Sequence, residues 1–92
     1  MAIDRELLDI ISKIKDTHEL EQLFKDLFTP AELDDLTLRW KLLKDLHKGV
    51  PQRRIAETYG ISLCKITRGS KVLKKKDGVV ADILKQLNGP AA

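Results

Sequence analysis

The sequence predicts an all-α fold of six helices within one domain, since 92 residues leave no room for a second core of useful size. Apolar residues recur at three- and four-residue steps along most of the chain, which is the spacing of one helix face. Capping residues and helix breakers divide this pattern into six segments. No segment shows the sustained two-residue alternation that is typical of a half-buried strand.

Two amphipathic helices are predicted in the first third of the chain. Isoleucine and leucine residues recur with helical spacing over residues 3–14, and leucine and phenylalanine residues do so over residues 20–28. Asp16 and Thr17 lie between the two segments. Their side chains suit the cap of the second helix, so we expect a short break there.

A third, longer helix is predicted after Thr29-Pro30-Ala31-Glu32, which has the composition of a capping box with proline at the first helical position. This helix is expected to run to about Lys48 and to end at Gly49. Leucine residues and Trp40 cover more than one of its faces. A helix that is apolar on several sides is usually surrounded, so we interpret this one as the central helix.

Three shorter helices are predicted in the second half of the chain. The first covers residues 52–59 and is ended by Gly60. Ser62 caps the next, which is expected over residues 63–75. The last one follows an Asp-Gly turn and covers residues 78–88, before an Asn-Gly-Pro sequence.

The segment Gln52–Gly69 has the pattern of a helix-turn-helix. Ala56 supplies the small residue where two helices cross, and Gly60, four positions later, tolerates the positive φ of the turn. Ile66 follows Gly60 by six residues, as expected for the buried face of the second helix. An ordinary helical hairpin can show the same spacings by chance. The spacings therefore indicate DNA binding only together with the distribution of charge along the chain. The apolar residues expected to tie the two helices to each other and to the core are Ile55, Tyr59, Ile61 and Ile66.

Charge is distributed unevenly along the chain, whose net charge is +3. Residues 1–48 contain eight basic and eleven acidic residues, whereas residues 49–76 contain eight basic residues and one acidic residue. A basic half joined to a helix-turn-helix indicates binding to double-stranded DNA, with the second helix in the major groove. The alternative is a protein-binding module of helical hairpins with a merely solvated basic surface, for which any DNA affinity would hardly depend on salt.

Several other classes of function are disfavoured. The single cysteine, Cys64, excludes an intrachain disulfide and a four-ligand zinc site, and it lacks an evident base partner. His18 and His47 are expected at the surface or at an interface rather than as metal ligands. No acid–base pair or phosphate-binding loop is visible, so we expect neither an enzyme nor a cofactor. Residues 4–6 are charged and no apolar run has the length of a membrane span, so we expect a cytoplasmic protein without a signal peptide.

The chain resembles the tryptophan repressor family from about Leu23 to Leu73. The string Ile66-Thr67-Arg68-Gly69-Ser70 after the helix-turn-helix is the most specific part, and Leu27-Phe28-Thr29-Pro30 supports it. The resemblance implies a bacterial repressor that is an intertwined two-fold homodimer, with core helices over residues 3–48 and 78–88 and a DNA-reading head over residues 51–75. It implies operators of tryptophan biosynthesis or transport as the DNA partner and L-tryptophan as the co-repressor. The remaining positions that carry the resemblance are Glu32, Arg39, Gly49, Gln52, Arg53, Leu73 and Lys74.

The same resemblance implies the site residues. Arg39 and Arg68 match two arginines that sandwich the indole ring, and Arg68 also matches the partner of the ligand carboxylate, a role that a flat guanidinium suits. Thr29 and the carbonyl groups at the end of the second helix match the part that receives the ligand ammonium. The implied ligand-binding residues are Phe28, Thr29, Arg39, Leu43, Arg68 and Gly69. The implied DNA-binding residues are Gln52, Arg53, Ser62, Leu63, Cys64, Lys65, Thr67, Lys71 and Lys74.

Two positions depart from the family pattern. Val72 stands where the family has a serine hydroxyl near the ligand ammonium, a loss that would weaken tryptophan binding by about 1 kcal/mol or more. Trp40 stands beside Arg39 where the family usually has a smaller residue, so its ring would narrow the pocket or fill part of it. The alternative function is therefore a regulator of the same fold that needs no ligand or uses another. From spacing alone, Arg39 also suits a surface pair with Asp35, and Arg68 also suits a phosphate contact.

Overall fold

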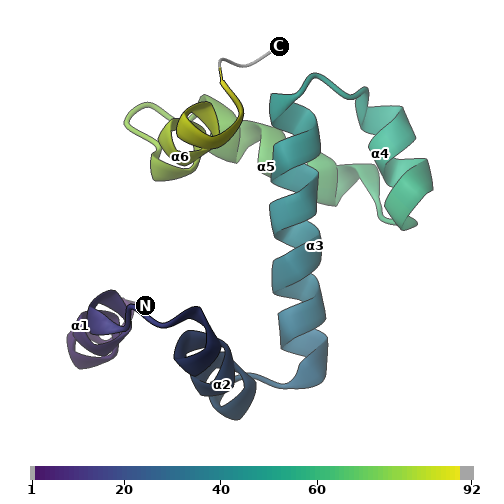
Figure 1. Ribbon diagram of the computed structural model, residues 1–92. Coiled ribbons are helices and arrows are strands. Elements are labelled where there is room, and N and C mark those ends of the chain that lie inside the picture. Colours follow the sequence, from purple (N-terminus) through teal and green to yellow (C-terminus); the bar gives the residue numbers. More distant parts are fainter. Residues whose placement is uncertain (1, 90–92) are drawn as a thin grey trace. The chain divides into compact units, whose positions relative to one another are not determined.

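A computed structural model describes residues 2–89 of the chain, and these residues form six α-helices and no strand, as predicted (Figure 1). Met1 and residues 90–92, which include the proline of the predicted Asn-Gly-Pro ending, lie outside the described residues. The helices are α1 (Arg5–Lys13), α2 (Thr17–Leu27), α3 (Pro30–His47), α4 (Gln52–Tyr59), α5 (Leu63–Lys74) and α6 (Val79–Asn88).

The chain divides into two compact units, one up to Asp34 and one from Asp35 onward, and each is described by itself. The first unit contains α1, α2 and the first turn of α3. The second contains the rest of α3 with α4, α5 and α6. The single domain with a shared core that the sequence suggests stays a prediction.

Helix caps explain the starts of the helices in the N-terminal unit. The Asp16 side chain accepts a hydrogen bond from the backbone N–H of His18 at 3.1 Å and caps α2, which confirms the predicted break. The backbone N–H of Thr29 donates to Glu32 Oε1 at 2.8 Å, and the N–H of Glu32 donates to Thr29 Oγ1 at 3.2 Å. This reciprocal pair is the predicted capping box at the start of α3. Within α1 and α2 themselves, no residue is buried.

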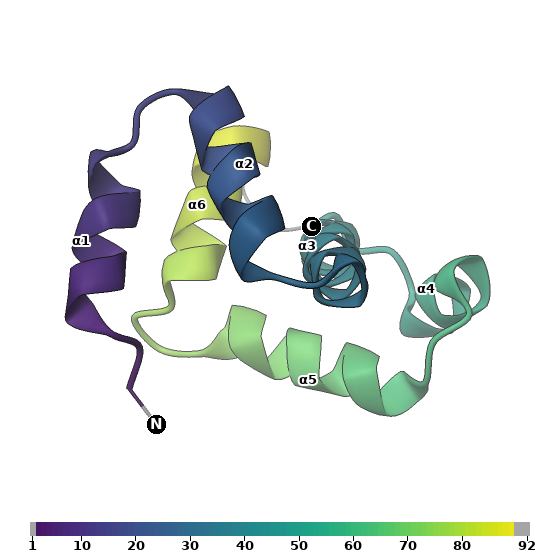
Figure 2. The same ribbon diagram turned by 90° about the horizontal axis from the view of Figure 1, so that it is seen from below.

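The core of the C-terminal unit lies around the C-terminal half of α3, beside which α4, α5 and α6 are grouped (Figure 1). Leu42 of α3 packs with Ile55 of α4 and Ile66 of α5, and all three are buried. Figure 2 shows α5 running past α3 between α4 and α6. The expectation of a surrounded α3 is wrong for this single chain, because Leu36 keeps 45% of its side chain exposed.

The end of α3 is fixed to the end of α6 by a buried histidine. The His47 ring is only 4% exposed, and its Nε2 lies 2.9 Å from the carbonyl oxygen of Gly89. Because a carbonyl only accepts, Nε2 carries the proton and donates it. The expectation of a surface or interface position for His47 is therefore wrong within this chain: the hydrogen bond to Gly89 satisfies a ring that the fold buries.

Candidate functional site

The candidate site is built on α4 and α5, which are joined by a tight turn. Gly60 adopts φ +62° and ψ +38°, the left-handed conformation that favours glycine, as the sequence predicts. The backbone N–H of Ile61 donates to the carbonyl of Ala56 at 3.2 Å, and the Ser62 side chain caps α5 by accepting the N–H of Lys65. These bonds end one helix and start the next within three residues, so the orientation of α5 is set locally.

The exposed side of this helix pair is strongly basic. Arg53 and Arg54 on α4 and Lys65, Lys71 and Lys74 on α5 are all exposed. Both ion pairs found among residues 2–89 lie in the N-terminal unit. Within the described residues, therefore, no carboxylate within 4 Å neutralises these five cations of α4 and α5. All nine residues predicted to face DNA are exposed, namely Gln52, Arg53, Ser62, Leu63, Cys64, Lys65, Thr67, Lys71 and Lys74.

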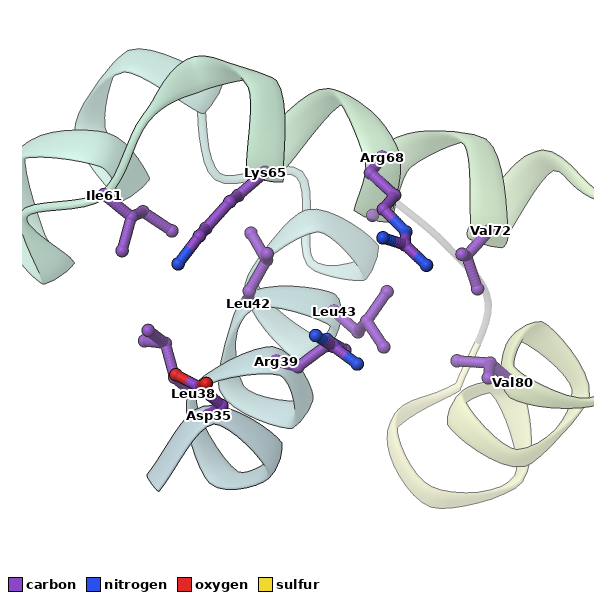
Figure 3. Close-up of a pocket in the computed structure, with 11 residues that line it drawn as sticks. Asp35, Leu38, Arg39, Leu42, Leu43, Ile61, Lys65, Arg68, Val72 and Val80 are labelled. Carbon is purple, nitrogen blue, oxygen red and sulfur yellow. The ribbon is translucent and has the colours of Figure 1, made fainter. Parts of the chain in front are cut away.

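A cavity of about 380 Å³ lies between α3 and α5, with α6 closing one end. Arg39 projects into it from α3 and Arg68 from α5 (Figure 3), so the two guanidinium groups lie on opposite walls of one space. Val72 and Val80 lie together at the α6 end. The cavity is lined by Asp35, Leu38, Arg39, Leu42, Leu43, Ile61, Lys65, Arg68, Gly69, Val72 and Val80.

A buried glycine sets the distance between the two cavity walls. A β-carbon added at Gly69 would lie 3.2 Å from Leu46 Cδ1 and 3.5 Å from Leu42 Cδ2, so any larger residue at this position of α5 would press on α3. Gly69 lines the cavity together with Arg39 and Arg68, so the cavity lies beside this close contact. The arrangement offers two flat cations to an aromatic anion.

Comparison with known proteins identifies the family. The chain matches the family described as Trp repressor protein over residues 4–88. The chain belongs to this family. Three curated relatives, each named Trp operon repressor homolog, support the assignment. The one from Vibrio campbellii is 37% identical over 84 residues, covering 90% of this chain and 84% of the relative. That from Chlamydia caviae is 34% identical over 84 residues, covering 90% and 83%, and that from Vibrio atlanticus is 37% identical over 87 residues, covering 87% of both. No solved structure matches the chain significantly.

Members of the Trp repressor family are DNA-binding regulators rather than enzymes, which confirms the expectation that this chain is not an enzyme. Within residues 2–89, no group of three or more His, Cys, Asp or Glu side chains is arranged to hold a metal ion. None of the helices in that range is both long and apolar enough to cross a membrane.

Four of the six implied ligand residues meet at the cavity. Arg39 and Leu43 line it from α3, and Arg68 and Gly69 line it from α5. The other two, Phe28 and Thr29, belong to the N-terminal unit, and their role in the ligand site stays a prediction. Lys65, which the resemblance places on the DNA side, also lines the cavity, and its side chain extends from α5 toward α3 (Figure 3).

The two departures from the family pattern have different outcomes. Trp40 is half-buried and is not among the described residues that line the cavity, so the expectation that its ring narrows or fills the pocket is not met. Val72 does line the cavity and makes the α6 end apolar. Asp35 and Arg39 form no ion pair within 4 Å in the described structure, so the surface pairing suggested by their spacing is absent there.

Several residues of the site were not found by sequence reasoning. Leu38, Leu42, Ile61 and Val80 line the cavity, but each is an ordinary apolar residue of an amphipathic pattern. Only a longer-range signal, such as the resemblance extended to α6, would single out Val80. These residues supply the apolar surface against which an aromatic ring packs.

A partly buried hydrogen bond holds α4 on α3. The hydroxyl of Tyr59 donates to Asp45 Oδ2 at 2.6 Å. This bond to the carboxylate, together with burial and the repulsion of a second negative charge, raises the pKa of Tyr59 above its usual value of 10. The bond therefore fixes the start of the turn that leads to α5.

Proposed function

We propose that this protein is a homodimeric repressor of a trp operon, and that L-tryptophan binding between α3 and α5 increases its affinity for operator DNA. The observation that carries this proposal is the pair of guanidinium groups, Arg39 and Arg68, on opposite walls of one cavity. The names of the relatives agree with it. The operators expected are those of tryptophan biosynthesis or transport.

The cavity suits an aromatic amino acid. An indole ring between Arg39 and Arg68 would meet a cation on each face, and Leu42, Leu43 and Ile61 would cover its edges. The Arg68 fork would pair with the carboxylate. Phe28 and Thr29, at the end of α2 and the start of α3, would receive the ammonium group. Such a ligand touches both cavity walls at once.

Ligand binding would act on DNA through α5. This helix forms one wall of the cavity and also carries most of the exposed cations. A ring held between α3 and α5 would stabilise one angle between them and so favour one orientation of the reading helix. The second helix of the helix-turn-helix would then lie in the major groove, with Gln52, Arg53 and either Lys71 or Lys74 on phosphates.

The dimer is supported by apolar surface that this chain leaves uncovered. On α6, Val79 is 68% exposed and Leu87 is 64% exposed, although Leu84 of the same helix is fully buried. Leu36 on the first half of α3 is also exposed. A second copy of the chain packed on these faces would enlarge a core that has only five buried apolar residues in the described part of one chain. Two reading heads would then meet successive major grooves, which lie about 34 Å apart.

Calorimetric titration with L-tryptophan tests the ligand, after sedimentation has established the oligomeric state. We expect saturable binding of one L-tryptophan per chain, and D-alanine, which lacks the ring, serves as the control ligand. A folded dimer that takes up no L-tryptophan at millimolar concentration would contradict the co-repressor role.

A regulator of the same fold with another ligand, or with none, is the second candidate. Val72 favours it, because a valine replaces a polar partner in the cavity wall. Gel shifts on DNA from a trp operon promoter, with and without L-tryptophan, separate the two functions. Equal affinity in both cases would favour this candidate, and affinity that is absent or hardly depends on salt would favour a protein-binding module.

A further inference from the structure

A second hollow lies on α5, separate from the arginine-lined cavity except for one shared side chain, Arg68. Its lining residues recur at the spacing of one helix face and all are exposed. They begin at the first residue of α5, directly after the Ser62 cap. The hollow is lined by Leu63, Cys64, Thr67, Arg68 and Lys71.

Three of the five residues that line this hollow have little hydrogen-bonding capacity. Leu63 is 52% exposed and purely apolar, and the thiol of Cys64 is only a weak donor. The hydroxyl of Thr67 donates to the backbone carbonyl of Leu63 at 2.9 Å, so its proton is already used within the helix. What these three side chains offer to a partner is mainly carbon and sulfur surface.

Two of the five residues that line the hollow are cationic. Arg68 and Lys71 line it together with the apolar residues, and Lys74 follows one turn later on α5. A hollow that combines apolar side chains with neighbouring cations fits a partner that presents a small apolar group within a strongly anionic surface. The major groove of duplex DNA has this character, because phosphates border it and the 5-methyl group of thymine is the apolar group on its base edges.

We propose that the hollow formed by Leu63, Cys64 and Thr67 receives the 5-methyl group of a thymine, and that this contact gives the reading helix its preference at that base pair. The inference rests on the proposed DNA binding and adds how bases are distinguished. The first turn of α5 carries no Asn, Gln or Arg that would bind a base edge with two hydrogen bonds, and its one cation, Lys65, lines the cavity between α3 and α5 rather than this hollow. Discrimination by apolar contact is therefore the route that this helix face offers.

The size of the effect follows from the burial of one methyl group. Moving one such group from water to an apolar contact changes an equilibrium constant by about fourfold. A dimer that places two hollows on two half-sites would show about 16-fold when both methyl groups are removed, since distant contacts add.

The experiment starts from duplexes selected out of a randomised pool by the full-length protein with L-tryptophan present. In each selected duplex, every thymine is replaced singly by deoxyuridine, which lacks only the 5-methyl group. We expect one position per half-site at which the replacement lowers affinity about fourfold. If no thymine responds to the replacement, the inference is wrong although DNA binding stands. If no duplex is selected even at low salt, the proposed DNA binding fails, and the inference fails with it.

Two variants locate the contact. Leu63→Asn keeps a side chain of similar size but makes the hollow polar, so the ratio of thymine to deoxyuridine affinity should fall to about one. Lys74→Ala removes a cation that does not line the hollow. It should lower affinity for both duplexes alike and leave their ratio unchanged. A ratio that persists in Leu63→Asn and in Cys64→Ser would show that another part of the protein reads the methyl group.

Discussion

Truncation of the two cavity arginines should weaken L-tryptophan binding by unequal amounts. Both side chains line the same space and both are exposed. A cation on an aromatic face at an exposed site contributes about 0.5–1 kcal/mol, so Arg39→Ala should raise the Kd about two- to fivefold. Arg68 would stack in the same way and also pair with the carboxylate. That charged hydrogen bond adds about 1.5–3 kcal/mol, which corresponds to a further loss of about 10- to 150-fold in Arg68→Ala.

A lysine substitution at position 68 separates the effect of the positive charge from that of the flat guanidinium shape. Arg68→Lys keeps the positive charge but loses the planar fork and the flat face, so it should recover only part of the lost affinity. Calorimetry measures the Kd values of all three variants, and circular dichroism establishes that they are folded. Equal losses for Arg39→Ala and Arg68→Ala would refute the assignment of the carboxylate to Arg68. Unchanged affinity in both would show that the ligand does not bind in this cavity.

Three further predictions concern α5 and the turn before it. Lys65→Ala should lower DNA affinity and reduce the slope of its salt dependence by about one per chain. Because Lys65 also lines the cavity, the same variant should weaken L-tryptophan binding. An unchanged titration with L-tryptophan would limit the role of Lys65 to DNA binding. Gly60→Ala should destabilise the protein by about 1 kcal/mol in urea unfolding, because φ is +62° at this position. No atom lies within 4 Å of an added β-carbon, so backbone strain is the only cause. Gly60→Asn should destabilise the protein less, and an alanine variant as stable as the parent would contradict this reasoning. The pKa of Tyr59 is raised in the folded protein, so its neutral form stabilises the fold below pH 10, and this stabilisation is lost as the pH rises through the folded pKa. Tyr59→Phe should therefore lose less stability at alkaline pH than the parent does in thermal melts. Identical alkaline profiles for the two proteins would contradict this.

Local chemistry made most helix boundaries predictable. The reciprocal bonds of Thr29 and Glu32 and the left-handed Gly60 depend on residues within a few positions of each other, so the sequence contains all of the information. The buried positions of Ile55 and Ile66 also follow from helical spacing. These features need no knowledge of the rest of the chain.

Features that depend on distant partners were not predictable in this way. His47 has no sequence signal for burial, because its partner is a backbone carbonyl 42 residues away at Gly89. The apolar pattern of α3 predicted a surrounded helix, but only its C-terminal half is buried by the single chain. Neither the presence of Lys65 in the cavity lining nor the absence of Trp40 from it follows from helix spacing alone.

The placement of both functions on α5 has an energetic consequence. Ile66 and Gly69 hold the helix on its own core, Arg68 lines both the cavity and the outer hollow, and three exposed lysines, Lys65, Lys71 and Lys74, lie on the same 12 residues. A ligand in the cavity therefore cannot change its contacts with Arg68 without affecting a residue that borders the proposed DNA contact. By thermodynamic linkage, DNA must change the affinity for tryptophan by the same factor by which tryptophan changes the affinity for DNA. Measuring L-tryptophan binding to the protein alone and to its DNA complex must therefore give the same coupling free energy as the two gel-shift affinities, and a coupling free energy of zero would show that the cavity and the DNA-facing surface are not linked through α5.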